Sequence, residues 1–181
     1  MASIKIVLAG FGGQGVLFAG KLIANTALIE DREVSWLPSY GPEMRGGTAN
    51  CSVTIADEPI GSPLVTAPDA LVAMNQPSLE KFMHAVEPGG LILADTTLVA
   101  TLPETSKLAE GVRVIGIPAS AMAEESGLKG LANIILVGKL WEQAKFCGRE
   151  TLDAALAGCV PPRKAHLLEP NKRALQLGID A

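Results

Sequence analysis

The sequence is poor in aromatic residues, has no run of basic residues and has no long apolar segment. Aromatic residues fill only 4% of the 181 positions and hydrophobic residues fill 48%, so we expect a core of mainly Ala, Val, Ile and Leu. The net charge of −4 argues against a nucleic-acid partner, because such proteins need a basic surface. No apolar run reaches the roughly 18 residues of a membrane-spanning helix, so we expect no membrane partner.

The first residues also lack the features of a signal peptide. Met1 to Lys5 lead straight into a predicted strand, without the charged and apolar regions that secretory signals carry. We therefore expect the protein to be cytoplasmic.

Cysteine and histidine are too scarce for a metal centre. Cys51, Cys147 and Cys159 lie far apart and form no C-x-x-C pair. An iron–sulfur cluster of the common kind needs four thiolates, so this chain cannot hold one alone. His84 and His166 show no metal-ligand spacing, and we interpret each as a surface or hydrogen-bonded helix residue.

Strand and helix patterns alternate along a chain whose length favours one domain, residues 1–181. This alternation predicts an α/β fold of three Rossmann-like layers, with a mostly parallel twisted sheet covered by helices on both faces. We expect strands at residues 4–9, 34–37, 49–55, 70–74, 91–94 and 112–117. We expect helices at residues 15–29, 76–86, 119–125, 131–146, 149–156 and 163–177. No helix-length segment separates the second strand from the third, which leaves room for an antiparallel edge and a mixed sheet.

The first glycine-bearing loop follows the first strand and opens the first helix. It fits the pattern G-x-G-x-x-G, and its candidate binding residues are Gly10, Gly12, Gly13, Gln14 and Gly15. Glycines allow a ligand to approach the backbone, and the free N–H groups of a helix N-terminus attract an anion. A tight turn that binds nothing is the alternative.

The residues around this loop give little support to a nucleotide site. A NAD site needs an acidic residue at the end of the second strand, but that strand ends in Leu37-Pro38-Ser39. Gly15 to Lys21 also matches the P-loop pattern, yet Leu22 replaces the Ser or Thr that would hold magnesium.

A second glycine-bearing loop, residues 39–47, follows the second predicted strand. The planar guanidinium of Arg45 suits a carboxylate or phosphate, and consecutive glycines allow close backbone approach. We interpret the loop as lining a ligand or a partner subunit, or else as a rigid loop whose Arg45 pairs with a local acid such as Glu43. Its candidate residues are Ser39, Tyr40, Gly41, Arg45, Gly46 and Gly47.

Asn75 and Asp95 end two further predicted strands. If these strands are parallel to the first, both side chains lie at the carboxyl edge of the sheet, where open α/β sheets bind ligands. Asn75 is a candidate binding residue, with a helix cap as the alternative. For Asp95 the alternative is a turn-forming role.

Four blocks of this sequence resemble the gamma subunit of 2-oxoacid:ferredoxin oxidoreductases. They occur in the same order and span nearly the whole chain. The blocks are residues 10–16, 39–47, 69–77 and 132–138. Indolepyruvate oxidoreductases carry a similar module.

The resemblance implies one subunit of an enzyme that decarboxylates a 2-oxoacid, forms an acyl-CoA and reduces ferredoxin. It implies thiamine diphosphate and magnesium between alpha and beta chains, and [4Fe-4S] clusters on beta and on a ferredoxin-like delta chain. This chain would then be free of clusters, inactive by itself, and placed beside the active site on the coenzyme A side.

Two other functions remain open from the sequence: a free-standing NAD(P) oxidoreductase and a phosphate- or CoA-binding module. The sequence does not distinguish pyruvate, 2-oxoglutarate or a branched-chain acid as the substrate. Purified without partners, the chain could self-associate as a homodimer through the surface meant for them.

Overall fold

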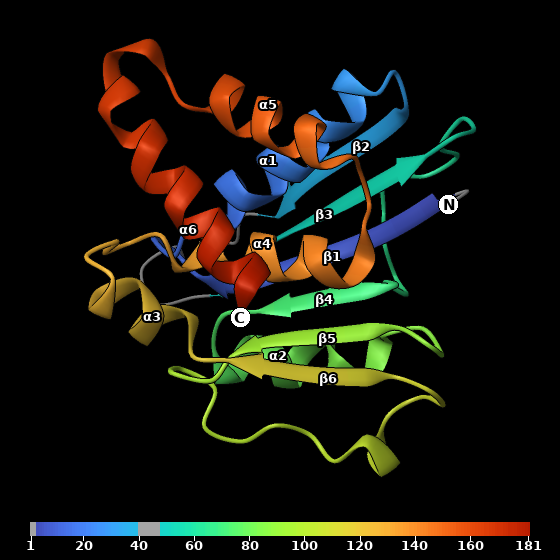
Figure 1. Cartoon of the computed structure of the whole chain (residues 1–181). Helices are drawn as coiled ribbons and strands as arrows, with labels where there is room; N and C mark the ends of the chain where they lie inside the picture. The colour runs from blue at the N-terminus through green and yellow to red at the C-terminus, as the bar shows by residue number, and fades with distance from the viewer. Residues whose placement is uncertain (1–2, 40–47) are drawn as a thin grey trace.

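The computed structural model describes residues 3–39 and 48–181, which form an α/β fold around one six-stranded sheet (Figure 1). The strand order is β2-β3-β1-β4-β5-β6. The strands are β1 (Ser3–Phe11), β2 (Glu33–Ser39), β3 (Thr48–Ala56), β4 (Ala70–Ala73), β5 (Leu91–Asp95) and β6 (Arg113–Ile117). The α-helices are α1 (Val16–Ile29), α2 (Gln76–Phe82), α3 (Ala119–Glu125), α4 (Ala132–Ala144), α5 (Arg149–Cys159) and α6 (Leu168–Asp180).

The sheet is mixed, which confirms the predicted fold class. β3 pairs antiparallel with both β2 and β1, whereas β1, β4, β5 and β6 pair in parallel. The antiparallel strand therefore lies one position inside the edge, and β2 forms the edge itself. Because β3 lies between β2 and β1 and is antiparallel to both, β2 runs parallel to β1 without being its neighbour.

Helices cover both faces of the sheet. Figure 1 shows α1, α4, α5 and α6 on one face and α2 on the other. The larger core lies under the first group and is built mainly from aliphatic residues such as Ile23, Ile134 and Leu152. A smaller core on the α2 side contains Leu71 and Leu79. β4 and β5 are buried along their whole length, as expected for strands covered on both faces.

The predicted C-terminal helix is interrupted. Residues 163–177 were expected as one helix, but the chain forms a 3-10 segment, η3 (Pro162–Leu167), followed by α6. Pro170 explains the break, because proline lacks an N–H and fits an α-helix only in its first turn. The predicted helix at residues 76–86 likewise ends as an α-helix at Phe82 and continues as the 3-10 segment η1 (Met83–Ala85). A further short 3-10 segment, η2 (Thr105–Lys107), was not expected.

Candidate functional site

The loop after β1 and the ends of β4 and β5 meet at the carboxyl edge of the sheet. β1 pairs in parallel with β4 and β4 with β5, so their C-terminal ends point the same way. This brings the first glycine loop beside Asn75 and Asp95, as the sequence predicted for parallel strands. The edge is therefore a candidate binding site built from three separate segments.

Gln14 joins the glycine loop to the end of β4. Its side-chain Oε1 accepts hydrogen bonds from Phe11 N and from Asn75 Nδ2, and its Nε2 donates to Met74 O at 3.1 Å. Gln14 also borders the cavity described below. The hydrogen bonds show that its amide holds the loop in place.

Asn75 caps helix α2. Its side-chain Oδ1 accepts a hydrogen bond of 2.9 Å from Ser78 N, and Asn75 itself has the extended backbone of an N-cap. The cap that the sequence left as the alternative is therefore present. Asn75 is almost fully buried, so its side chain holds neighbouring backbone and side-chain groups in place and is not exposed at the edge.

The glycines of the loop meet different structural needs. Gly13 and Gly15 have φ angles of 95° and 76°, which favour glycine over any residue with a side chain. A Cβ on Gly15 would also overlap the side chain of Asn133, whose Nδ2 donates to Gly15 O at 3.1 Å. Gly10 lies in β1 opposite Ala49, and Gly12 is exposed in the turn.

Asn133 lies in the first turn of α4, next to the start of α1. It is 4% exposed, and within the described part of the chain its buried Oδ1 has no hydrogen-bond partner. The amide thus fastens the two helix N-termini to each other through its donor alone.

Asp95 connects the end of β5 to helix α3. Its carboxylate is 1% exposed and accepts hydrogen bonds from Thr97 N at 3.1 Å and from Ser120 Oγ at 2.6 Å. The turn-forming role that the sequence left open is present, and Ser120 adds a contact to a second element. Sequence reasoning missed Ser120, although its place just after the last parallel strand was a usable signal.

A cavity of about 300 Å³ opens between this edge and the segment that joins α3 to α4. Its polar lining includes Gln14, Asp95, Ser120, Glu124 and Lys129, and its apolar lining comes from residues such as Leu136. The cavity reaches the N-terminal ends of α1 and α4, whose unpaired N–H groups favour an anion. Lys129, which the sequence analysis did not single out, adds a positive charge.

The strands on either side of the second glycine loop reach the same edge of the sheet as the first loop. Ser39 ends β2 opposite Asn50, and Phe11 ends β1 opposite Thr48. Ser39 is exposed at this edge. The remaining predicted residues of this loop, Tyr40, Gly41, Arg45, Gly46 and Gly47, lie outside the described residues.

The topology does not favour a nucleotide site of the dinucleotide or P-loop kind. In the dinucleotide fold the strand after the first helix lies next to the first strand, but here β3 lies between β2 and β1. Gly20 and Lys21 of the P-loop pattern lie within α1, where Gly20 packs against Cys51 and Trp36.

The cysteines are buried thiols. Burial raises the pKa of Cys51 to about 11 and that of Cys147 to about 12. Across residues 3–39 and 48–181, no three His, Cys, Asp or Glu side chains come together as metal ligands. In the same part of the chain, no helix has the length and apolar character needed to cross a membrane.

A family model and several proteins match this chain. The model described as pyruvate ferredoxin/flavodoxin oxidoreductase matches residues 5–181. A ketoisovalerate oxidoreductase subunit, VorA, of Methanothermobacter thermautotrophicus is 40% identical over 98% of this chain and 36% of its own length. A 2-oxoglutarate synthase subunit, KorC, of Methanocaldococcus jannaschii is 37% identical over 87% of this chain and 83% of its own.

Solved structures show the same fold. The gamma subunit of a keto/oxoacid ferredoxin oxidoreductase from Geobacter sulfurreducens has a TM-score of 0.82 and 29% identity, covering 98% of this chain and 96% of its own. A 2-oxoglutarate:ferredoxin oxidoreductase from Magnetococcus marinus, solved with 2-oxoglutarate, coenzyme A and succinyl-CoA, has a TM-score of 0.86 and 25% identity. It covers 99% of this chain and 31% of its own. The chain thus spans about a third of the VorA relative and of the Magnetococcus chain, but most of the KorC and Geobacter chains.

Proposed function

Because this chain belongs to the pyruvate ferredoxin/flavodoxin oxidoreductase family, we propose that it is the gamma-type subunit of a 2-oxoacid:ferredoxin oxidoreductase. The complex would convert a 2-oxoacid and CoA to an acyl-CoA and CO2, with reduction of ferredoxin. The family match over residues 5–181 carries this proposal. The similarity to the KorC subunit and to the Geobacter gamma subunit, over most of each of those chains, supports the gamma-type assignment.

The catalytic centre would lie on other chains. In this proposal thiamine diphosphate and magnesium are held by alpha and beta chains, and the [4Fe-4S] clusters by beta and a ferredoxin-like delta chain. Residues 1–181 then form one module of a cytoplasmic complex. The two relatives are named for ketoisovalerate and 2-oxoglutarate, so the oxoacid stays undetermined between them and pyruvate.

The cavity at the carboxyl edge gives the chain a role on the coenzyme A side. Two helix N-termini and Lys129 border it and favour a phosphate group, although the carboxylates of Asp95 and Glu124 also line it. Its volume of about 300 Å³ is at the small end of ligand pockets, so it would hold one phosphate-bearing end of CoA. Gln14 and Asn133 would keep the glycine loop and the helix ends in place for this contact.

Purification from native cells tests the subunit role. We expect a tagged copy of the chain, isolated without oxygen, to bring down thiamine-diphosphate-dependent chains and CoA-dependent, 2-oxoacid-dependent reduction of ferredoxin. The isolated chain should show none of this activity. Repeated recovery of the chain alone would contradict the proposal.

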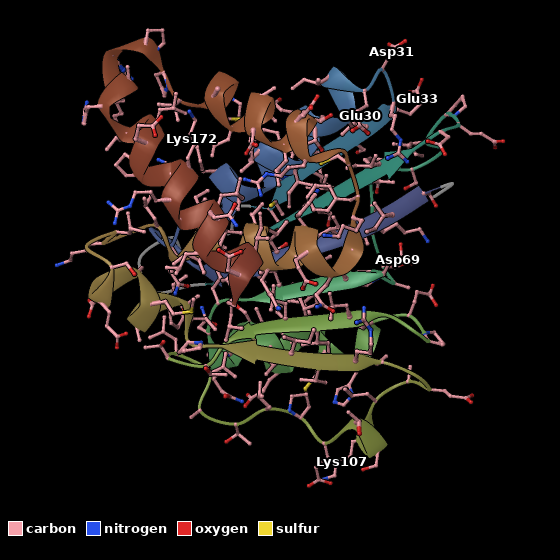
Figure 2. The ribbon with its side chains drawn as sticks, in the orientation of Figure 1. Glu30, Asp31, Glu33, Asp69, Lys107 and Lys172 are labelled. Carbon is pink, nitrogen blue, oxygen red and sulfur yellow. The ribbon has the colours of Figure 1, made fainter. Side chains whose placement is uncertain are left out.

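Substitution of Lys129 tests the CoA role in the same complex. Lys129→Ala should raise the KM for CoA by about tenfold, because a charge-assisted contact to phosphate is lost, and should leave the KM for the oxoacid unchanged. The matched control is Lys107→Ala, since Lys107 lies in η2, between β5 and β6, and Figure 2 shows it away from α3 and α4. An equal KM for CoA in both variants would contradict the proposal that this cavity binds CoA.

A further inference from the structure

Asp95 and Ser120 both line the cavity at the carboxyl edge and are hydrogen-bonded to each other. The Oγ of Ser120 lies 2.6 Å from the Oδ2 of Asp95. A carboxylate accepts hydrogen bonds and donates none, so the hydroxyl of Ser120 gives its only proton to Asp95. The oxygen of Ser120 keeps its lone pairs, and it therefore meets a ligand only as a hydrogen-bond acceptor.

The backbone N–H groups beside this pair are already bonded within the chain. Ser120 N donates to both carboxylate oxygens of Asp95 at 3.2 Å, and Thr97 N donates to Asp95 Oδ1 at 3.1 Å. Ala121 N donates to Thr97 Oγ1 at 3.1 Å. Free N–H groups would attract an anion, but these three are taken.

Glu124 adds a second carboxylate one turn further along α3. Residues four apart lie on the same side of a helix, and both Ser120 and Glu124 line the cavity. Figure 1 shows α3 beside the carboxyl ends of β5 and β6. We call Asp95, Ser120 and Glu124 the acceptor wall.

The acceptor wall is unsuited to a phosphate group. A phosphate is negatively charged and rich in acceptor oxygens, so the carboxylates of Asp95 and Glu124 repel it and Ser120 offers it no proton. Lys129 and the N-terminal ends of α1 and α4 supply the positive charge elsewhere in the lining. The wall therefore fits a neutral ligand group that carries an N–H or O–H donor.

The rest of the lining is largely apolar. Met74, Leu98, Ala123 and Leu136 lie among the polar residues of the cavity. An apolar lining with a few placed polar groups is typical of sites that bind a hydrocarbon chain with isolated polar groups.

CoA combines the two kinds of group that the cavity separates. Its diphosphate is followed by the pantetheine arm, a largely hydrocarbon chain that carries two amide N–H donors. We propose that Ser120 accepts a hydrogen bond from one of these amide N–H groups, so that the arm lies along the acceptor wall and the phosphates lie toward Lys129. This proposal rests on the proposed function and names the part of CoA that each side of the cavity binds.

The two residues of the pair have different roles in this proposal. Ser120 touches the ligand and determines specificity for an N–H donor. Asp95 is a positioning residue, because it acts through Ser120 by taking the hydroxyl proton.

CoA analogues test the contact in the purified complex. Each of two analogues has one amide N–H of the arm replaced by an ester oxygen, which cannot donate. The wild-type complex should prefer CoA over one analogue by about threefold to tenfold in kcat/KM, the effect of one hydrogen bond. Ser120→Ala should abolish this preference.

Two further variants are the controls. Ser120→Thr keeps the hydroxyl and should keep the preference for CoA. Ser106→Ala removes the hydroxyl of an exposed serine in η2, outside the cavity lining, and should also keep it. A merely structural effect of Ser120→Ala would change the kcat/KM of CoA and of both analogues alike, and would overturn the proposal.

Asp95→Asn tests the positioning role. An asparagine amide donates as well as accepts, so the hydroxyl of Ser120 becomes free to act as a donor. The preference for CoA over the ester analogue should therefore fall. An unchanged preference would overturn the role of Asp95.

The outcomes separate this proposal from the proposed function. Equal kcat/KM of the wild type with CoA and both analogues, or a full preference in Ser120→Ala, would overturn the amide contact and leave the subunit role intact. Oxoacid oxidation that does not depend on CoA would overturn the proposed function. If Ser120→Ala does not assemble, Ser120→Cys replaces it, because a thiol of similar size is a poor acceptor. A full preference in that variant would likewise overturn the contact.

Discussion

The polar side chains at the carboxyl edge mainly hold the edge together. Gln14, Asn75 and Asp95 each bond to backbone groups of a neighbouring segment, at Met74, Ser78 and Ser120 respectively. These bonds satisfy buried polar atoms and hold the glycine loop in place, with Gln14 N also donating to Phe11 O within the loop. The predicted site residues therefore divide into supports, such as Asn75, and candidate contacts, such as Gly13.

The sequence predicted that Asn75 and Asp95 lie at the same edge of the sheet, but it did not predict which other residues lie near them. Parallel strands end at one edge, so the chain positions of Asn75 and Asp95 were informative. Asn133 reaches the same region from α4, and Lys129 from the turn before α4. Their positions depend on how that helix packs. No local pattern specifies that packing.

Cys51 provides a test of burial at the residue scale. Desolvation raises the pKa of its thiol to about 11 from 9.0. Between these pH values the unfolded chain has released the proton and the folded chain still holds it, so stability must fall as pH rises. We expect the free energy of unfolding to drop between pH 9 and 11 by an amount on the order of 1 kcal/mol from this thiol.

Urea denaturation at several pH values measures this effect. The comparison is with Cys51→Ala, which should show a shallower decline because it lacks this thiol. Identical pH slopes for the wild type and the variant would show that the thiol ionises alike in both states.

At the scale of elements, the periodicity of the sequence predicted most helices and strands. α3 has the predicted bounds, and β5 extends one residue beyond them. The position of β3 was not predictable in this way, because strand order depends on pairing between distant segments. The missing helix between β2 and β3 signalled an antiparallel pair but did not indicate which strand would lie next to β1.

The crossing of α4 and α6 depends on two glycines. A Cβ on Gly178 would overlap Ile135 O, and a Cβ on Gly138 would overlap Leu175 O. Gly178→Ala must therefore push the helices apart, and we expect it to lower the free energy of unfolding by about 1–3 kcal/mol. Urea denaturation measures this loss.

Gly158→Ala is the matched control for this prediction. Gly158 lies in α5, and a Cβ there would meet nothing within 4 Å. The variant should equal the wild type or gain up to about 1 kcal/mol, because alanine favours helix over glycine. Equal stability of the Gly178 and Gly158 variants would contradict the close crossing of α4 and α6.

At the scale of the whole molecule, composition and order of motifs predicted more than any single motif did. The first glycine loop alone suggested a nucleotide, whereas the four blocks together indicated one subunit of a larger enzyme. The exposure of Leu28 and Ile29 at the end of α1 was not foreseen, since the same residues would suit a fully buried helix.

The topology of the whole sheet predicts that the isolated chain does not bind NADH or NADPH. A dinucleotide site needs an acid at the end of the strand that adjoins β1 and follows the first helix, because that acid holds the ribose. Here β3 separates β2 from β1, and β2 ends in Ser39. Glu30 and Asp31 lie at the far end of α1, a helix length away from the glycine loop. Calorimetric titration should therefore give no saturable heat with either cofactor at millimolar concentration, under conditions where a known dehydrogenase responds. Saturable binding that Gly15→Ala abolishes would instead establish the glycine loop as a dinucleotide site despite its strand order.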